Sequence, residues 1–274
     1  MKNAAAGDVA AGDVAVKDAI IKDEIIHRIG SALRDYEKRR GLEGFWKEPL
    51  TAFLSAADPR LPGLKKSVSP GHLLPGEVLP GAGGIVCFFI PFQDRIVEGN
   101  TAAGRCSREW AAAYIHTNDL IARIGDEIGA LMAEKGFSTG KIKATHNFNE
   151  QTLISDWSHR HIACLAGLGS FGLNNMLITG AGCCGRVGSV VTGWGPVPSP
   201  EPFRERCLHR LRGGCGLCRT RCPAGAYRGG GFDRRACYAQ CLMNAGIYRD
   251  LGLADVCGKC LTALPCSTRD PSVQ

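Results

Sequence analysis

The sequence lacks long apolar segments. None of its 274 residues belongs to an uninterrupted apolar run of the ~18 residues that a membrane-spanning helix needs. A secretion signal is not predicted, because Asp8 and Asp13 interrupt the alanine-rich start where such a signal has its apolar core. Arg39 and Arg40 are not followed by an apolar stretch, so a twin-arginine export signal is not expected. We therefore expect a cytoplasmic protein with no membrane partner.

Cysteine, in contrast, is abundant near the C-terminus. Residues 215–266 hold eight of the chain's 14 cysteines. Cys222 is followed by Pro223, as in bacterial ferredoxin motifs of the form C-x2-C-x2-C-x3-C-P. Arg212 stands where that motif has its first cysteine, so one ligand must come from elsewhere. At four thiolates per cubane, the pattern predicts two [4Fe–4S] clusters, with eight candidate ligands: Cys215, Cys218, Cys222, Cys237, Cys241, Cys257, Cys260 and Cys266.

The spacing also suggests how these cysteines divide between the clusters. One group contains Cys215, Cys218 and Cys266, with either Cys241 or Cys207 as its fourth member. The other group contains Cys222, Cys237, Cys257 and Cys260. Paired C-x2-C units are also typical of structural zinc sites, and disulfides are a third interpretation. From residue 201 onward the chain has 12 Lys and Arg against 6 Asp and Glu, a net charge of +6 that would offset anionic clusters.

The whole chain is 45% hydrophobic, which predicts one main domain besides the cysteine-rich segment. Apolar residues at helical spacing predict helices over about 14–40 and 107–135. The continuous apolar run 85–92 predicts a buried strand that contains Cys87 as a core residue. Residues 57–84 are rich in proline and glycine and are expected to form a surface loop with a solvated His72. We predict an N-terminal helical segment (1–50, the first ~13 residues of low complexity), an α/β core (51–200) and a cluster module (201–274).

A second informative stretch spans residues 157–192. It begins as a predicted helix to Ala166, and residues 167–172 then contain three glycines that allow close approach of a flat or anionic ligand. This G-x-G-x-x-G string does not follow a clear strand, which argues against a dinucleotide fingerprint. Residues 182–189 are predicted to be a loop leading into a strand at 190–192. Cys183 and Cys184 are adjacent, so we expect them to line a pocket or lie in the core.

These two stretches together resemble epoxyqueuosine reductases, relatives of the corrinoid-dependent reductive dehalogenases. The A-G-L-G-x-x-G segment at 166–172, the L-I-T that follows, the G-R-V-G-S-V-V-T segment and the cysteine module carry the resemblance. It covers residues 150–270 well and 80–135 loosely. The resemblance implies an α+β or α/β fold with a nitroreductase-like, corrinoid-binding core and a ferredoxin-like two-cluster module. It also implies that cobalamin is bordered by Gly167, Leu168, Gly169, Phe171, Gly172 and Asn175, and on its other side by Gly185, Arg186, Gly188 and Ser189.

The candidate catalytic residues lie just before the glycine-rich stretch. The family carries a proton-donating acid in this region, and Asp156 is the nearest acid here, although its surroundings differ. His159 and His161 are candidates because the pKa of histidine lies near neutrality. They lie two residues apart, so on a helix they point to different sides.

Our leading hypothesis is an iron–sulfur, corrinoid-dependent reductase that uses an external electron donor such as flavodoxin or ferredoxin, with epoxyqueuosine in tRNA as the substrate that the resemblance suggests. The alternatives are a two-cluster electron carrier, or corrinoid-reducing protein, with no substrate of its own, and a zinc-stapled binding module.

Overall fold

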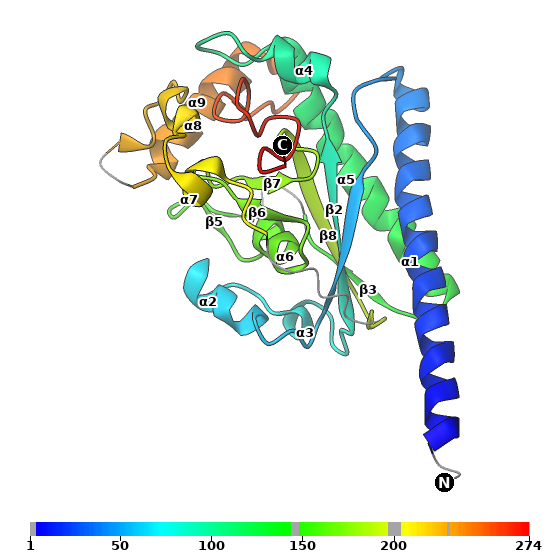
Figure 1. Ribbon diagram of the computed structural model, residues 1–274. Coiled ribbons are helices and arrows are strands. Elements are labelled where there is room, and N and C mark those ends of the chain that lie inside the picture. Colours follow the sequence, from blue (N-terminus) through cyan, green and yellow to red (C-terminus); the bar gives the residue numbers. More distant parts are fainter. Residues whose placement is uncertain (1–3, 144–147, 197–203, 229–230, 274) are drawn as a thin grey trace.

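The computed structural model describes residues 4–143, 148–196, 204–228 and 231–273, and side chains from Ala15 onward. It has three layers: two long helices, a four-stranded sheet, and a layer of short helices and hairpins (Figure 1). The cysteine-rich C-terminal segment gathers at one end of the sheet. Among the described helices, none is both long and apolar enough to cross a bilayer.

The central sheet is entirely antiparallel. Its strand order is β1-β2-β8-β3, with bounds Leu50–Ser55, Gly84–Pro91, Gly185–Thr192 and Thr139–Lys141. All eight residues of β2 are buried, because helices cover one face of the sheet and the short-helix layer covers the other. Successive side chains of a strand alternate between its faces, so Phe88 enters one core while Cys87 and Phe89 enter the other. The predicted buried strand and the core position of Cys87 are confirmed.

The two long helices, α1 (Ala4–Arg40) and α5 (Arg108–Glu134), cover one face. Helix α5 begins where predicted, because the Ser107 side chain caps it by accepting a hydrogen bond from the Trp110 amide. Ile25 and Ile29 of α1 pack into the core beneath α5. Helix α1 begins ten residues earlier than its apolar periodicity predicts and extends past the sheet (Figure 1).

On the opposite face of the sheet, the prediction of a surface loop at 57–84 is wrong. This segment contains three helical turns, Leu61–Gly63, Leu64–Ser67 (α2) and Pro75–Val78 (α3), and buries Leu61 and Leu64 in a second core. His72 is fully buried, not solvated. Its ring stacks on Trp157 with centroids 5.7 Å apart, and its two nitrogens bond the Leu73 carbonyl and the Ser158 amide. Trp157 and the backbone of Leu73 and Ser158 therefore surround the His72 ring, which we had expected to contact solvent.

The predicted loop at 182–189 is also wrong from Gly185 onward, where β8 begins. Gly185 and Gly188 allow β8 to pack closely against the neighbouring strand. A Cβ at Gly185 would lie 2.5 Å from the Phe89 ring, and one at Gly188 would lie 2.4 Å from the Phe88 ring. Glycine inside a strand often marks such a close approach. The two residues thus make room for aromatic rings of β2.

Smaller elements complete the chain. Helix α4 (Asp94–Gly99) precedes α5, and the hairpins are β4–β5 (Phe148–Asn149, Ile154–Ser155) and β6–β7 (Gly169–Phe171, Leu177–Thr179). Helix α6 (His159–Leu165) lies between the hairpins in sequence and packs on the sheet. The cysteine-rich segment contains α7 (Leu208–Arg212), α8 (Leu217–Thr220), α9 (Arg234–Ile247) and a short 3-10 turn (Arg249–Leu251).

Candidate metal centre and active-site cavity

Nine cysteines line two separate cavities in the C-terminal segment. The larger cysteine cavity, of about 320 Å³, is lined by Cys222, Cys237, Cys241, Cys257 and Cys260. The smaller cysteine cavity, of about 30 Å³, is lined by Cys207, Cys215, Cys218 and Cys266. Cys207 and Cys241 were the two candidates for the fourth member of the group with Cys215, Cys218 and Cys266. Cys207 lies with that group, whereas Cys241 lies beside Cys237. In the described part of the chain, no three Cys, His, Asp or Glu side chains approach closely enough to hold one metal ion.

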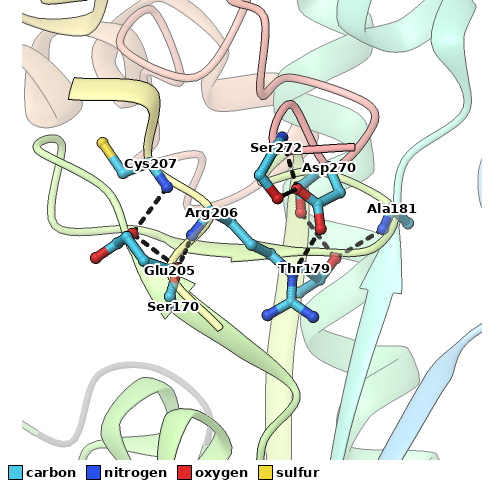
Figure 2. Close-up of polar contacts among 9 residues, drawn as sticks. Ser170, Thr179, Ala181, Glu205, Arg206, Cys207, Asp270 and Ser272 are labelled. Atoms are coloured by element: carbon cyan, nitrogen blue, oxygen red, sulfur yellow. Dashed lines mark hydrogen bonds and ion pairs between the residues drawn. The ribbon is translucent and has the colours of Figure 1, made fainter. Parts of the chain in front are cut away.

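A hydrogen-bond network holds Cys207 at the smaller cysteine cavity (Figure 2). Glu205 accepts hydrogen bonds from the Cys207 amide at 2.8 Å and from the Ser170 hydroxyl at 3.1 Å. The amide of Arg206 donates to Ser170, and its guanidinium Nε lies 3.0 Å from an Asp270 carboxylate oxygen. This largely buried ion pair ties the chain just before α7 to the C-terminal turn that follows Cys266. The sequence spacing alone therefore could not position Cys207.

The loop between Cys257 and Cys260 packs tightly against α5. Gly258 has φ +73°, and a Cβ there would lie 2.3 Å from the Trp110 indole. The Trp110 ring nitrogen is buried without a protein partner and belongs to a residue that lines the larger cysteine cavity. Such a buried donor is costly unless a bound group accepts its hydrogen bond.

Lys259 is a functional candidate that the sequence analysis missed. Only 2% of it is exposed, and its ammonium donates to the carbonyl and side-chain oxygens of Asn100, each at 2.9 Å. Asn100 also donates to the Cys257 carbonyl at 3.1 Å, so the ammonium is anchored to the cysteine loop. A lysine between the two cysteines of a C-x2-C pair was the available signal. Its buried positive charge favours an anionic group nearby.

Burial raises the thiol pKa of several of these cysteines. The pKa of Cys218 rises to about 11 and that of Cys260 to about 12, in each case first because of desolvation and then because of neighbouring cysteines. Metal binding requires the thiolate and therefore releases these protons. Cys183 and Cys184 are buried, as predicted, and Cys184 Sγ lies 3.2 Å from the Leu261 carbonyl.

A third cavity, the central cavity, lies among β8, α6 and the start of α9. Its volume is about 410 Å³, and an adjoining cavity of about 840 Å³ shares Arg160, His161, Met176 and Arg234 with it. Cys237 and Cys241 line the adjoining cavity as well as the larger cysteine cavity. The larger cysteine cavity also shares Arg186 with the central one. The three spaces are therefore neighbours.

The two candidate histidines of α6 contact different elements, Ser189 of β8 and Phe171 of β6, although both line the central cavity. His159 is buried, and its Nε2–H donates to the Lys143 carbonyl at 3.2 Å. Its Nδ1 lies 2.7 Å from the Ser189 hydroxyl, which also accepts from the Trp157 ring nitrogen at 3.1 Å. Burial lowers the pKa of His159 to about 4, so the ring is neutral at pH 7. All its hydrogen-bonding groups are thus engaged within the fold.

His161 faces the cavities. Its Nδ1 lies 2.7 Å from the Ser158 hydroxyl, and its ring lies 4.5 Å from that of Phe171, centroid to centroid. Burial, reinforced by the nearby Arg160, lowers its pKa to about 4. Asp156, in contrast, is exposed and is not among the residues that line the central cavity. The structure therefore brings the two histidines to this cavity without the acid.

The residues predicted to border a corrinoid are divided among several environments. Gly185 and Arg186 line the central cavity, Phe171 and Asn175 line the adjoining cavity, and Gly172 lines the smaller cysteine cavity. Ser189 lies behind the central cavity, bonded to His159 and Trp157. The rest do not line these cavities: Gly167, Leu168, Gly169 and Gly188. The sequence analysis missed Arg160 and Arg234, which no motif marks.

Comparison with known proteins identifies relatives by fold only. Neither a protein-family model nor a curated protein sequence matches the chain. Among solved structures, an epoxyqueuosine reductase with a tRNA-Tyr epoxyqueuosine-modified stem loop is 18% identical, with TM-score 0.58, over 91% of this chain and 66% of that one. The Bacillus subtilis epoxyqueuosine reductase is 17% identical, with TM-score 0.53, over 87% and 66%.

A catabolic reductive dehalogenase in complex with 3-bromo-4-hydroxybenzoic acid is 17% identical, with TM-score 0.56, over 81% of this chain and 30% of that one. The chain thus spans just under two thirds of the reductases' length and about a third of the dehalogenase's. The resemblance inferred from the sequence is confirmed at the level of the fold, which is the mixed α/β fold shared by both groups of enzymes.

Proposed function

We propose that this protein is an iron–sulfur reductase that passes electrons from two [4Fe–4S] clusters to a corrinoid held in the central cavity. The observation that carries the proposal is the adjacency of the cavities. Two groups of cysteines line two cavities, and the larger of these adjoins a third that is large enough for a ligand. The shared fold supports the same conclusion.

The donor sets fit two cubanes. We assign Cys207, Cys215, Cys218 and Cys266 to one of them, because these four cysteines line the smaller cysteine cavity. Five cysteines line the larger cavity, and we assign ligation to Cys222, Cys237, Cys257 and Cys260, with Cys241 as their neighbour. The sulfurs of a cubane bind different irons and lie farther apart than those around one zinc ion.

The local charges fit an anionic cluster. The buried ammonium of Lys259 is anchored within the cysteine loop of the larger cavity. The Trp110 ring nitrogen is an unpartnered buried donor at the same cavity. Hydrogen bonds and positive charge near cluster sulfurs stabilise the reduced cluster. Both residues would therefore raise its reduction potential.

A corrinoid would lie in the central and adjoining cavities. When bound, it supplies a strongly reducing cobalt centre able to remove an oxygen or similar group from a substrate. Gly185 and Arg186 would contact it from β8, and Phe171 and Asn175 from the β6–β7 side. Trp157 and Leu177, two buried apolar residues that line the central cavity, would help to exclude water from it. His161 presents a neutral ring that can hold a hydrogen bond without adding charge.

We extend the proposal to transfer RNA as a partner, because one fold relative was solved with an epoxyqueuosine-modified tRNA stem loop. The exposed arginines of the C-terminal segment, including Arg210, Arg212 and Arg219, can contact phosphates. Titration with a tRNA stem loop at several salt concentrations tests this. We expect the logarithm of the affinity to fall linearly with the logarithm of salt concentration, and affinity independent of salt would contradict phosphate contact.

The first experiment is anaerobic absorption spectroscopy with iron, sulfide, zinc and cobalt analysis, repeated after cobalamin is added. We expect a broad band near roughly 400 nm, about eight irons per chain, and a cobalamin spectrum that shifts on binding. Zinc without colour would refute the cluster assignment and leave a zinc-stapled module.

A second candidate function is a two-cluster electron carrier with no substrate of its own. It is favoured by the position of Asp156, which is exposed and outside the residues that line the central cavity. Clusters without cobalamin uptake would support the carrier. Cobalamin uptake together with reduction of an epoxyqueuosine-containing stem loop by a flavodoxin or ferredoxin system would refute it.

A further inference from the structure

The central cavity is unusually basic. Arg160 of α6, Arg186 of β8 and Arg234 of α9 all line it. No Asp or Glu is among the described residues that line this cavity, and its two histidines are neutral at pH 7 because burial lowers the pKa of each to about 4. Three elements far apart in sequence thus bring three guanidinium groups to one space.

Across the part of the chain that the structure describes, no carboxylate forms an ion pair with any of these three guanidinium groups. Arg160 donates instead to the Asn175 carbonyl and lies 3.3 Å from the Met176 sulfur. Arg186 lies over the Tyr114 ring, with its guanidinium carbon 4.5 Å from the ring centroid.

Arg186 also has an unsatisfied donor. Its Nε is buried and has no hydrogen-bond partner. Desolvation lowers the pKa of both Arg160 and Arg186. The positive charges of Arg186 and Arg234 lower the pKa of Arg160 further. Tyr114 and Asp255 act on the pKa of Arg186 in the opposite sense. Asp255 lines the larger cysteine cavity and accepts a hydrogen bond from the Tyr114 hydroxyl. Buried cations without a matching anion are costly.

We infer that Arg160, Arg186 and Arg234 form an oxyanion site that binds a carboxylate or phosphate group of the molecule entering the central cavity. A guanidinium group presents a planar fork of donors that matches such oxyanions. The open Nε of Arg186 supplies one donor, and Arg234 supplies a charge at the rim from the exposed start of α9. Binding there would compensate the three positive charges.

This inference deepens the proposed function and rests on it in one respect, that the central cavity is where a reactant binds. The adjoining cavity contains Cys237 and Cys241, so an oxyanion held by Arg160 and Arg234 would fix a substrate near the proposed electron source. The anionic group has two possible origins with the same chemistry. One is an acidic substrate, and the other is the phosphate in the nucleotide loop of a corrinoid.

Calorimetric titration of the cluster-loaded protein tests the site, with inorganic phosphate and benzoate as probes and benzamide as the neutral analogue of benzoate. Trp157 lines the cavity, so its fluorescence gives a second readout. We expect the two anions to bind and benzamide not to bind. Arg234→Gln and Arg186→Gln should each weaken anion binding at least tenfold.

The matched control is Arg235→Gln, because Arg235 is the exposed neighbour of Arg234 on α9 but does not line the central cavity. It should leave anion binding unchanged. Equal loss in the Arg234 and Arg235 variants would overturn the inference, and so would unchanged binding in the Arg234 and Arg186 variants. Because Arg234 is exposed, its variant keeps the test valid even if Arg186→Gln does not fold.

Uptake of cobalamin and of cobinamide, which lacks the nucleotide phosphate, identifies the source of the anion. If Arg234→Gln weakens cobalamin uptake but not cobinamide uptake, the site binds the corrinoid phosphate. If both uptakes are unchanged while benzoate binding is lost, the site binds an acidic substrate. Iron content and cobalamin uptake of the wild-type protein are scored separately, so a failure of the proposed function is distinguishable from a failure of the oxyanion site.

Discussion

The most discriminating prediction concerns Gly258, in the loop between two proposed cluster ligands. Gly258→Ala introduces two separate costs. A φ of +73° in an L-residue other than glycine costs roughly 1–2 kcal/mol. The new methyl would also lie 2.3 Å from Trp110 Cε2 and Cζ2, far inside contact distance, and such overpacking costs typically about 1–3 kcal/mol. We therefore expect a total loss of roughly 2–5 kcal/mol in the free energy of unfolding.

Gly136→Ala separates the two costs. Gly136 has φ +80°, but a Cβ there has no heavy atom within 4 Å, so only the backbone cost of roughly 1–2 kcal/mol applies. Thermal unfolding of the two variants under anaerobic conditions measures the difference, at about 2–4 °C per kcal/mol for a chain of this size class. Iron content provides a second readout, because only Gly258 lies in a cysteine loop.

A double-mutant cycle with Trp110→Leu completes the test. Removal of the indole takes away the atoms that the new methyl would meet, so Gly258→Ala should then cost about as much as Gly136→Ala. If Gly258→Ala and Gly136→Ala are equally destabilising in the wild-type background, the tight packing of the cysteine loop on Trp110 is refuted.

Three further predictions address the clusters and the buried histidine. Lys259→Met removes a buried positive charge and should lower the reduction potential of the cluster in the larger cysteine cavity by tens of millivolts, where ~59 mV is a tenfold change in a one-electron equilibrium; an EPR-monitored redox titration that gave an unchanged potential would contradict this. Cys207→Ser should reduce the iron content from about eight to about four per chain, whereas Cys241→Ser should leave it nearly unchanged; the reverse result in iron analysis would show that Cys241 is the ligand. Because burial holds the folded pKa of His159 at about 4, below the unfolded value of ~6.5, the unfolded chain takes up the proton first, and stability is lost as pH falls between these values, by up to about 3 kcal/mol. Urea denaturation from pH 7 to 4 should show a shallower decline for His159→Gln, and parallel curves would argue against a neutral buried ring.

Local sequence was sufficient for the long helices and the buried strand. The apolar positions of 107–135 recur at helical spacing, and Ser107 caps that helix, so its start could be predicted from adjacent residues. The apolar run that became β2 was equally clear, because a strand covered on both faces needs no polar side. The adjacent Cys183 and Cys184 were also interpreted correctly as buried residues.

Predictions failed where a residue's environment came from distant chain. His72 was expected in solvent because its neighbours are prolines and glycines, but Trp157 and the Ser158 amide, more than eighty residues away, bury it. The glycines at 185 and 188 were interpreted as a loop, although they lie in a strand where the rings of Phe88 and Phe89 need the space.

By itself, the sequence determined the dense cysteine spacing, the basic charge around it and the periodicity of the main helices, because each of these depends on residues close together in the chain. Only the tertiary structure decided which cysteines share a cavity, how Lys259 is anchored by Asn100, and that Arg160, Arg186 and Arg234 meet. The physical reason is that a cavity, a buried charge and an unpaired donor are properties of surfaces that come together on folding. No local motif encodes them.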